Sequence, residues 1–168
     1  SQWAIAQYAK WGIEARQEKY GTWRGWERGI THIDMVSPRV QTLDGMQLAW
    51  SASTPAGGVA GEVVALPKNI QDSTAFKNWL PSVKGKFVMI SMPQPTGRPD
   101  YNWEEFATEE SFAKMKEERD AQTTAWRENI RNTGYTSRTI GAALEEAGAV
   151  GLVASYWSRA FGSNKIFS

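Results

Sequence analysis

The sequence predicts an α+β domain whose mostly β core is flanked by helices, on three observations. A Lys-Gly-Lys turn at residues 84–86 leads into the apolar run 87–91. An apolar-striped segment over 137–147 is closed by a glycine and followed by the apolar run 149–154. The composition of residues 104–132 is strongly helical. Short apolar runs between turn residues are typical of buried strands, so we expect a curved core of about six or seven strands.

The first 40 residues are predicted to form a leading helix and an extended arm. Apolar residues at helical spacing run up to Gly12, the pattern of a helix closed by a glycine cap. Because this helix begins at the first residue, we expect the chain to be cut from a longer polypeptide. Residues 13–26 are polar and aromatic and predict the arm. The predicted division is therefore 1–40 and 41–168.

Three further strands are predicted before the first core helix. Residues 30–36 alternate apolar and polar, the strand period, and Pro38 ends that run. Residues 40–50 are predicted to be extended around Asp44-Gly45, a dipeptide typical of hairpin turns. Residues 59–66 predict another strand.

The predicted helices have recognisable ends. Asp72 is a good N-cap for a helix over 72–80, and a proline at position 81 ends it. Residues 93–133 form an insertion that starts with a proline-rich connector and continues as the long helix 104–132. Gly134 is the predicted cap of this helix. The last residues, 155–168, are predicted to be a loop or arm.

The long helix is predicted to lie outside the core, with one apolar stripe and one solvated face. The stripe contains Phe112, Met115, Trp126 and Ile130. The run 117–120 is expected to face water. The basic residues predicted to lie on its surface are Lys114, Lys116, Arg119, Arg127 and Arg131.

Composition excludes several classes of protein. The 168 residues contain no cysteine, so they form no disulfide, no thiolate zinc site and no cysteine nucleophile. Nineteen basic and 18 acidic side chains are interspersed and give a net charge of +1, which argues against nucleic acid as a partner. No apolar window is long enough for a membrane span, and no signal-peptide pattern is present.

Catalytic chemistry is not predicted for this chain. His32 is the single histidine, and with Asp34 two residues on it offers too few ligands for a catalytic zinc; we expect a hydrogen-bonded strand residue. The glycine cluster 57–61 lacks the Lys-Ser/Thr of a phosphate loop and predicts a turn. Adjacent acidic residues diverge on a helix, so four such pairs are expected to be solvated: Glu104-Glu105, Glu109-Glu110, Glu117-Glu118 and Glu145-Glu146.

One aromatic and basic cluster is a candidate interaction surface. Trp23, Arg24 and Trp26 lie within the glycine-rich segment 23–29. Arginine and tryptophan side by side can stack and present a recognition surface. The alternative is an arm that packs on another domain of the full protein, and the sequence leaves both interpretations open.

Residues 50–157 resemble the protease-associated domain. In that family a Gly-Lys-Val strand precedes a helix and an Ala-Gly-Ala-x-Gly-x-(Val/Ile) motif. Here Gly85-Lys86-Phe87-Val88 and the run 147–153 stand at those places, after a strand containing 59–64. The resemblance implies a curved β-sandwich or open barrel flanked by helices. The insertion 93–133 departs from the compact family pattern.

The flanking residues extend the resemblance. The helix up to Gly12, the run 20–27 and the His-Ile-Asp segment 32–34 resemble the part that leads into the inserted domain of exported bacterial zinc aminopeptidases, relatives of glutamate carboxypeptidase and the transferrin receptor. This implies a secreted or periplasmic parent enzyme with two zinc ions. None of its ligand motifs occurs here, so no catalytic, cofactor or metal residue is assigned.

The function expected from the resemblance is that of a non-catalytic domain. It would shape substrate access to the catalytic peptidase domain of the same polypeptide, or mediate contacts with a peptide or protein substrate. The alternative is a stand-alone peptide- or protein-binding module that uses the Trp23/Trp26 segment or the outer helix.

Overall fold

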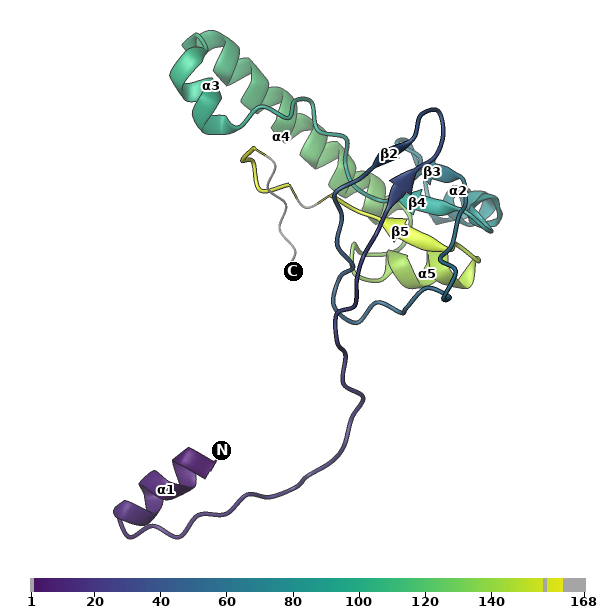
Figure 1. Cartoon of the computed structure of the whole chain (residues 1–168). Helices are drawn as coiled ribbons and strands as arrows, with labels where there is room; N and C mark the ends of the chain where they lie inside the picture. Colours follow the sequence, from purple (N-terminus) through teal and green to yellow (C-terminus); the bar gives the residue numbers. More distant parts are fainter. Residues whose placement is uncertain (1, 156, 162–168) are drawn as a thin grey trace. The chain divides into compact units, whose positions relative to one another are not determined.

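The computed structural model describes residues 2–155 and 157–161, and the chain divides into two compact units, Ser1–Ser51 and Ala52–Ser168 (Figure 1). The predicted boundary lay between residues 40 and 41. The described residues form five α-helices, one 3-10 helix and five strands in two small sheets. The expected mixture of helices and strands with one long helix is confirmed. The described strands form no closed barrel and are fewer than expected.

The first unit begins with helix α1 (Gln2–Lys10). Its end has the predicted glycine cap, because Gly12 adopts a positive φ of 74°. The Ile13 N–H donates to the Tyr8 carbonyl at 3.0 Å, which closes the last turn. The described part of the arm that follows, residues 13–33, contains no helix or strand.

A two-stranded antiparallel sheet, β1 (Asp34–Met35) and β2 (Gln41–Thr42), is the other regular element of the first unit. Its chain reversal lies at residues 36–40, so the prediction of a hairpin turn at Asp44-Gly45 is wrong. Gly45 serves a close approach instead, since a Cβ there would lie 2.5 Å from the Ile33 side chain. Proline at position 38, which lacks an N–H donor, suits the observed turn.

The second unit is built on a three-stranded parallel sheet. Its strands are β3 (Val63–Ala65), β4 (Phe87–Met89) and β5 (Gly151–Val153), in the order β3-β4-β5. Helix α2 (Ser73–Trp79) and the 3-10 helix η1 (Leu80–Val83) connect the first two strands. Parallel strands need such crossover connections.

Predicted caps position these elements. Asp72 accepts a hydrogen bond from the Ala75 N–H at 2.8 Å and so begins α2. Gly85 has a φ of 72° in the turn before β4. Helix α5 (Ile140–Glu146) ends at Gly148, whose φ is 91°. The chain therefore enters β4 and β5 through glycine-dependent turns, as the sequence indicated.

The predicted helix 104–132 is interrupted, and in this respect the prediction is wrong. Helix α3 (Asp100–Phe106) ends first, and helix α4 (Glu109–Asn132) begins after Thr108. The Thr108 hydroxyl accepts a hydrogen bond from the Ser111 N–H at 3.3 Å, so this threonine caps a new helix. The predicted cap at Gly134 is confirmed by a φ of 82°.

The apolar stripe of α4 is confirmed at Met115 and Ile130, which are buried, whereas Phe112 and Trp126 are half-buried. The predicted surface position of Arg119 is wrong, because this residue is 3% exposed. It follows Met115 by four positions and so lies on the same helix face. The other basic residues of the predicted set are exposed.

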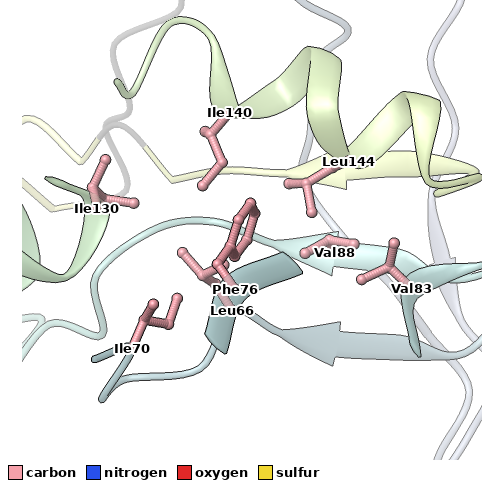
Figure 2. Packing of buried hydrophobic residues seen from close by; sticks show 8 residues of the cluster. All are labelled: Leu66, Ile70, Phe76, Val83, Val88, Ile130, Ile140 and Leu144. Atoms are coloured by element: carbon pink, nitrogen blue, oxygen red, sulfur yellow. The ribbon is translucent and has the colours of Figure 1, made fainter. Parts of the chain in front are cut away.

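The core of the second unit lies between one face of the sheet and its helices (Figure 2). Phe76 from α2 and Leu144 from α5 meet over Val88 of β4, and all three are fully buried. Ile130 brings the end of α4 to the same cluster. The remaining buried members are Leu66, Ile70, Val83 and Ile140.

Candidate functional site

The face of the sheet opposite the core is a bare apolar surface. Strand register places Val63 beside Phe87 and Gly151, and Ala65 beside Met89 and Val153. Neighbours in register point to the same face of a sheet. These six residues, which we call the bare sheet face, therefore form two rows that contain no polar side chain.

Exposure distinguishes the two faces most clearly at the central strand β4, where Met89 is 44% exposed and Val88 on the core face is fully buried. Val63 and Val153 on the bare sheet face are 58% and 45% exposed. On the core face Val64 is half-buried, and Leu152 of the edge strand β5 is 41% exposed. A sheet inside a folded domain is ordinarily covered on each apolar face. Contiguous exposed apolar side chains mark sites where a protein contacts another surface.

The bare sheet face has a shaped centre. The Phe87 ring lies across Gly151, where a Cβ would come within 2.8 Å of the ring. Gly61 lies on another side of the ring, and a Cβ there would be 3.7 Å from it. Glycine at position 151 thus allows the ring to lie close to the sheet, and the Phe87 side chain remains half-buried.

The predicted surface formed by Trp23, Arg24 and Trp26 lies in the first unit, outside helices and strands. Trp23 is 71% exposed and has its ring 5.8 Å from that of Tyr20. Trp26 is half-buried, and its indole Nε1 donates to the Ser51 carbonyl at 3.0 Å. The three residues therefore do not share one environment.

The arginine that stacks in this segment is Arg28. Its guanidinium carbon lies 5.3 Å from the centre of the Trp26 ring. Its Nη1 also donates to the Gln47 carbonyl at 2.8 Å. Trp26 and Arg28 thus connect this segment to residues 47–51 by hydrogen bonds, whereas Trp23 and Arg24 remain exposed.

His32 forms the predicted hydrogen bond, with Asp34 Oδ2 at 2.9 Å from its Nε2. It lies just before β1 and not within a strand, so that part of the prediction is wrong, and its side chain is exposed. The Thr42 hydroxyl donates to the other carboxylate oxygen at 2.8 Å. The hydrogen bond from Thr42 is the largest cause of the lowered pKa of Asp34; desolvation opposes it, and His32 lowers the pKa further.

No group of three or more His, Asp or Glu side chains in the described part of the chain is placed to hold a metal ion. The four predicted acidic pairs are all exposed. The predicted turn at 57–61 is confirmed only at its start: the turn spans 55–58, with a φ of 74° at Gly58 and its N–H donating to the Pro55 carbonyl at 2.8 Å.

Two adjoining hollows lie beside the end of α4, and the first of them also borders the residues that follow β4 and β5. Their volumes are about 220 and 250 Å³. Trp126, Ile130 and Ser137 line both hollows. Sequence patterns did not reveal these hollows, because they depend on how the end of α4 approaches the sheet.

No protein-family model, curated protein or solved structure matches this chain. Among the described helices, none is both long enough and apolar enough to cross a membrane.

Proposed function

We propose that the chain is a non-catalytic, protease-associated-type domain of an exported zinc aminopeptidase. In this proposal the bare sheet face packs on the catalytic domain of the same polypeptide, and the domain shapes the access of peptide or protein substrates. Zinc would belong to that catalytic domain. A protease-associated sandwich or barrel would then be completed by surfaces that cover this face.

The bare sheet face is the observation that carries the proposal. Its exposed side chains Val63, Met89 and Val153 are apolar, while Val88 at the centre of the opposite face is fully buried in the core. Apolar area gains about 25 cal/mol per Å² when it is removed from water. This surface is therefore better suited to a lasting domain contact than to a polar, transient one.

The first experiment uses the whole polypeptide that the gene encodes. Met89→Lys should weaken the packing of the domain on the peptidase and change kcat/KM for long peptides more than for aminoacyl anilides. In the 168-residue chain the same substitution should leave unfolding nearly unchanged, because Met89 is already exposed.

Phe106→Lys is the matched control, since Phe106 is an exposed apolar residue of α3, outside the bare sheet face. Equal effects of the two substitutions on kcat/KM would contradict the proposal. So would aminopeptidase turnover by the 168-residue chain with added zinc that disappears in His32→Ala.

A second candidate function, a stand-alone binding module, is favoured by one observation. Tyr20 and Trp23 form an exposed aromatic pair, 86% and 71% exposed. Aromatic residues are frequent anchors of binding sites. A gene without zinc-ligand segments on either side of this region, together with loss of peptide binding in Trp23→Ala, would favour this candidate.

A further inference from the structure

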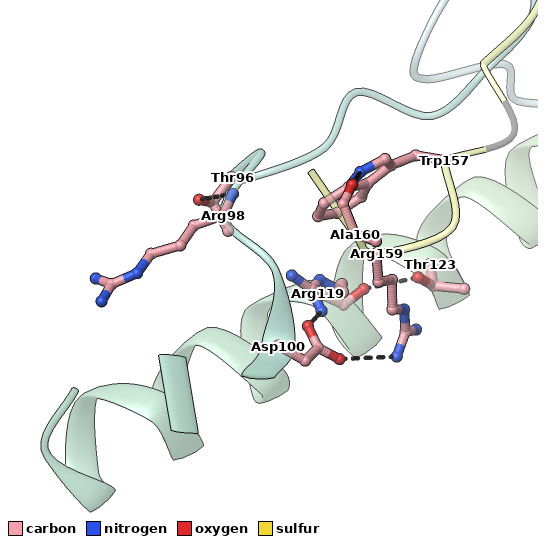
Figure 3. Close-up of polar contacts among 8 residues, drawn as sticks. All are labelled: Thr96, Arg98, Asp100, Arg119, Thr123, Trp157, Arg159 and Ala160. Atoms are coloured by element: carbon pink, nitrogen blue, oxygen red, sulfur yellow. Dashed lines mark hydrogen bonds and ion pairs between the residues drawn. The ribbon is translucent and has the colours of Figure 1, made fainter. Parts of the chain in front are cut away.

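Arg119 is a buried arginine in the middle of α4. Its side chain is 3% exposed, and its Nη1 pairs with Asp100 Oδ1 of α3 (Figure 3). The Thr123 hydroxyl donates to the Arg119 carbonyl at 2.8 Å, one turn further along. Burying an arginine is unfavourable unless its charge and its N–H groups are matched.

The matching of Arg119 is incomplete. Its Nε and Nη2 atoms are buried and have no hydrogen-bond partner among the residues that the structure describes. In a guanidinium group the N–H bonds of these two atoms form one edge, with the spacing of the two oxygens of a carboxylate. The Nε/Nη2 edge of the guanidinium group is therefore free, while Asp100 pairs with Nη1.

The surrounding charges have the sign that suits an anion. Arg159 Nη1 lies 3.4 Å from Asp100 Oδ2, so two guanidinium groups share one carboxylate. One positive charge of this cluster is left unmatched. A bound carboxylate would balance that charge and satisfy the free edge at the same time.

An aromatic turn covers the site. The guanidinium carbon of Arg119 lies 5.6 Å from the centre of the Trp157 ring. The Trp157 Nε1 donates to the Ala160 carbonyl at 2.7 Å, which closes the turn 157–160 beside Arg119 (Figure 3). Because the Nε and Nη2 atoms are buried, binding of a ligand to them requires this turn to move.

We propose that the Nε/Nη2 edge of Arg119 binds a carboxylate beneath the Trp157 turn. The carboxylate belongs to a free small acid or to the C-terminus of a peptide. Arg119 and Asp100 lie on the insertion, whereas Trp157 and Arg159 lie after β5. None of these residues belongs to the bare sheet face, and the proposal does not depend on the function proposed above.

Thermal unfolding of the 168-residue chain tests the site, with sodium acetate replacing sodium chloride at constant ionic strength. Wild type should show a saturable rise in its unfolding midpoint. Arg119→Met should show no rise, because it removes the fork, whereas Arg131→Met removes an exposed charge of the same helix and should respond like wild type. No saturable rise in wild type, or an equal rise in Arg119→Met, would overturn the proposal.

If Arg119→Met does not fold, the variant Arg119→Lys and the Arg119 Nε–H resonance of wild type still test the proposal. Arg119→Lys keeps the charge but loses the two-point geometry, so its affinity for acetate should fall about tenfold or more. In wild type the Arg119 Nε–H resonance should shift with acetate and exchange more slowly with water. An unshifted resonance at saturating acetate would contradict binding at this edge.

A comparison of two peptides identifies the source of the carboxylate. A short peptide with a free C-terminus and its amidated form are compared by the same Nε–H resonance. A shift with the free acid alone assigns the site to peptide C-termini, and a shift with acetate but with neither peptide assigns it to small acids. Equal shifts with both peptides would overturn recognition through a carboxylate.

Discussion

The two units of the molecule are stabilised in different ways. In the described part of the first unit, residues 2–51, no residue is buried. Its apolar side chains include Ile30 and Val40, which are 99% and 82% exposed. The second unit contains the whole buried hydrophobic cluster. Burial of apolar surface is the main favourable contribution to folding, so the second unit should carry nearly all of the stability.

Polar contacts take the place of a core in the first unit. Trp26 and Arg28 donate to the carbonyls of Ser51 and Gln47, and Asp34 joins His32 to Thr42. A typical hydrogen bond adds about 1 kcal/mol net, and exposed ones are easily exchanged for water. Segments with few buried contacts open at low free energy. We therefore expect the second unit to be destabilised by substitutions of buried side chains, and the first unit by the loss of polar contacts.

The largest expected effect comes from the core of the second unit. Phe76→Ala removes a fully buried ring that packs against Trp79 and Tyr135, with centroids 5.9 and 5.7 Å away. We expect the free energy of unfolding to fall by about 3–5 kcal/mol, because the change leaves a cavity. Urea unfolding followed by circular dichroism measures this loss.

Phe106→Ala, at an exposed position in α3, is the control and should change the free energy of unfolding by less than about 1 kcal/mol. The amide resonances of β1 and β2 should be the same in both variants before unfolding. A comparable loss in the two variants would remove the distinction between core and surface on which the comparison rests.

The second-largest effect on the free energy of unfolding is expected from the buried hydrogen bonds of Asn129 in the second unit. Asn129 is 4% exposed; its Oδ1 accepts from the Ile70 N–H at 2.8 Å and its Nδ2 donates to the Pro67 carbonyl at 2.7 Å. Asn129→Ala leaves both backbone groups without these partners, so unfolding should become easier by about 1–3 kcal/mol. Urea unfolding measures this change, with Gln71→Ala as the control because it removes an exposed hydrogen bond.

The contrast between Asn129 and Gln71 can also be measured by the rate of hydrogen exchange. Hydrogen exchange at the Ile70 amide should accelerate in Asn129→Ala, because its acceptor is removed. An unchanged exchange rate at Ile70, with unfolding equal to that of the Gln71 variant, would show that this link adds no stability.

Local chemistry made much of the second unit predictable from sequence. Asp72, Gly85 and Gly148 act as the sequence indicated, because capping and positive φ depend on a few neighbouring residues. The runs that became β4 and β5 were also recognised. Their partners and register were not, since parallel pairing joins residues far apart in the chain.

The failures of prediction share a cause, which is that local patterns do not show tertiary environment. Asp44-Gly45 has the chemistry of a hairpin turn, yet the chain reverses at 36–40 and Gly45 instead packs against Ile33. Arg119 was assigned to the surface by its charge, although its spacing from Met115 places it on the buried stripe. That spacing was the available signal. The bare sheet face, by contrast, requires knowledge of which side the helices cover.

A smaller effect is expected at the start of α2. Asp72→Ala removes the acceptor of the Ala75 N–H and should lower the free energy of unfolding by about 1 kcal/mol. Asp72→Ser retains an acceptor and should recover most of this loss. Urea unfolding of the two variants measures the difference, and equal values would show that the cap contributes little.

The smallest effect should be confined to the first unit and depend on pH. Asp34 has its pKa lowered in the folded hairpin, first by the Thr42 hydroxyl and then by His32. A carboxylate with a lower pKa when folded stabilises the hairpin fully at pH above its ordinary value of about 4, and this contribution is lost as pH falls through the lowered value.

The amide of Leu43, which donates to the Ile33 carbonyl at 2.9 Å, is a suitable reporter of the hairpin. Its NMR resonance should move in acid below pH of about 4, while that of Phe76 in the core stays in place. Asp34→Asn should abolish the movement, and Thr42→Val should shift its midpoint to higher pH by removing the main cause of the lowered pKa. If Phe76 moved together with Leu43, the two units would not respond independently, and the contrast between a polar first unit and a packed second unit would have to be abandoned.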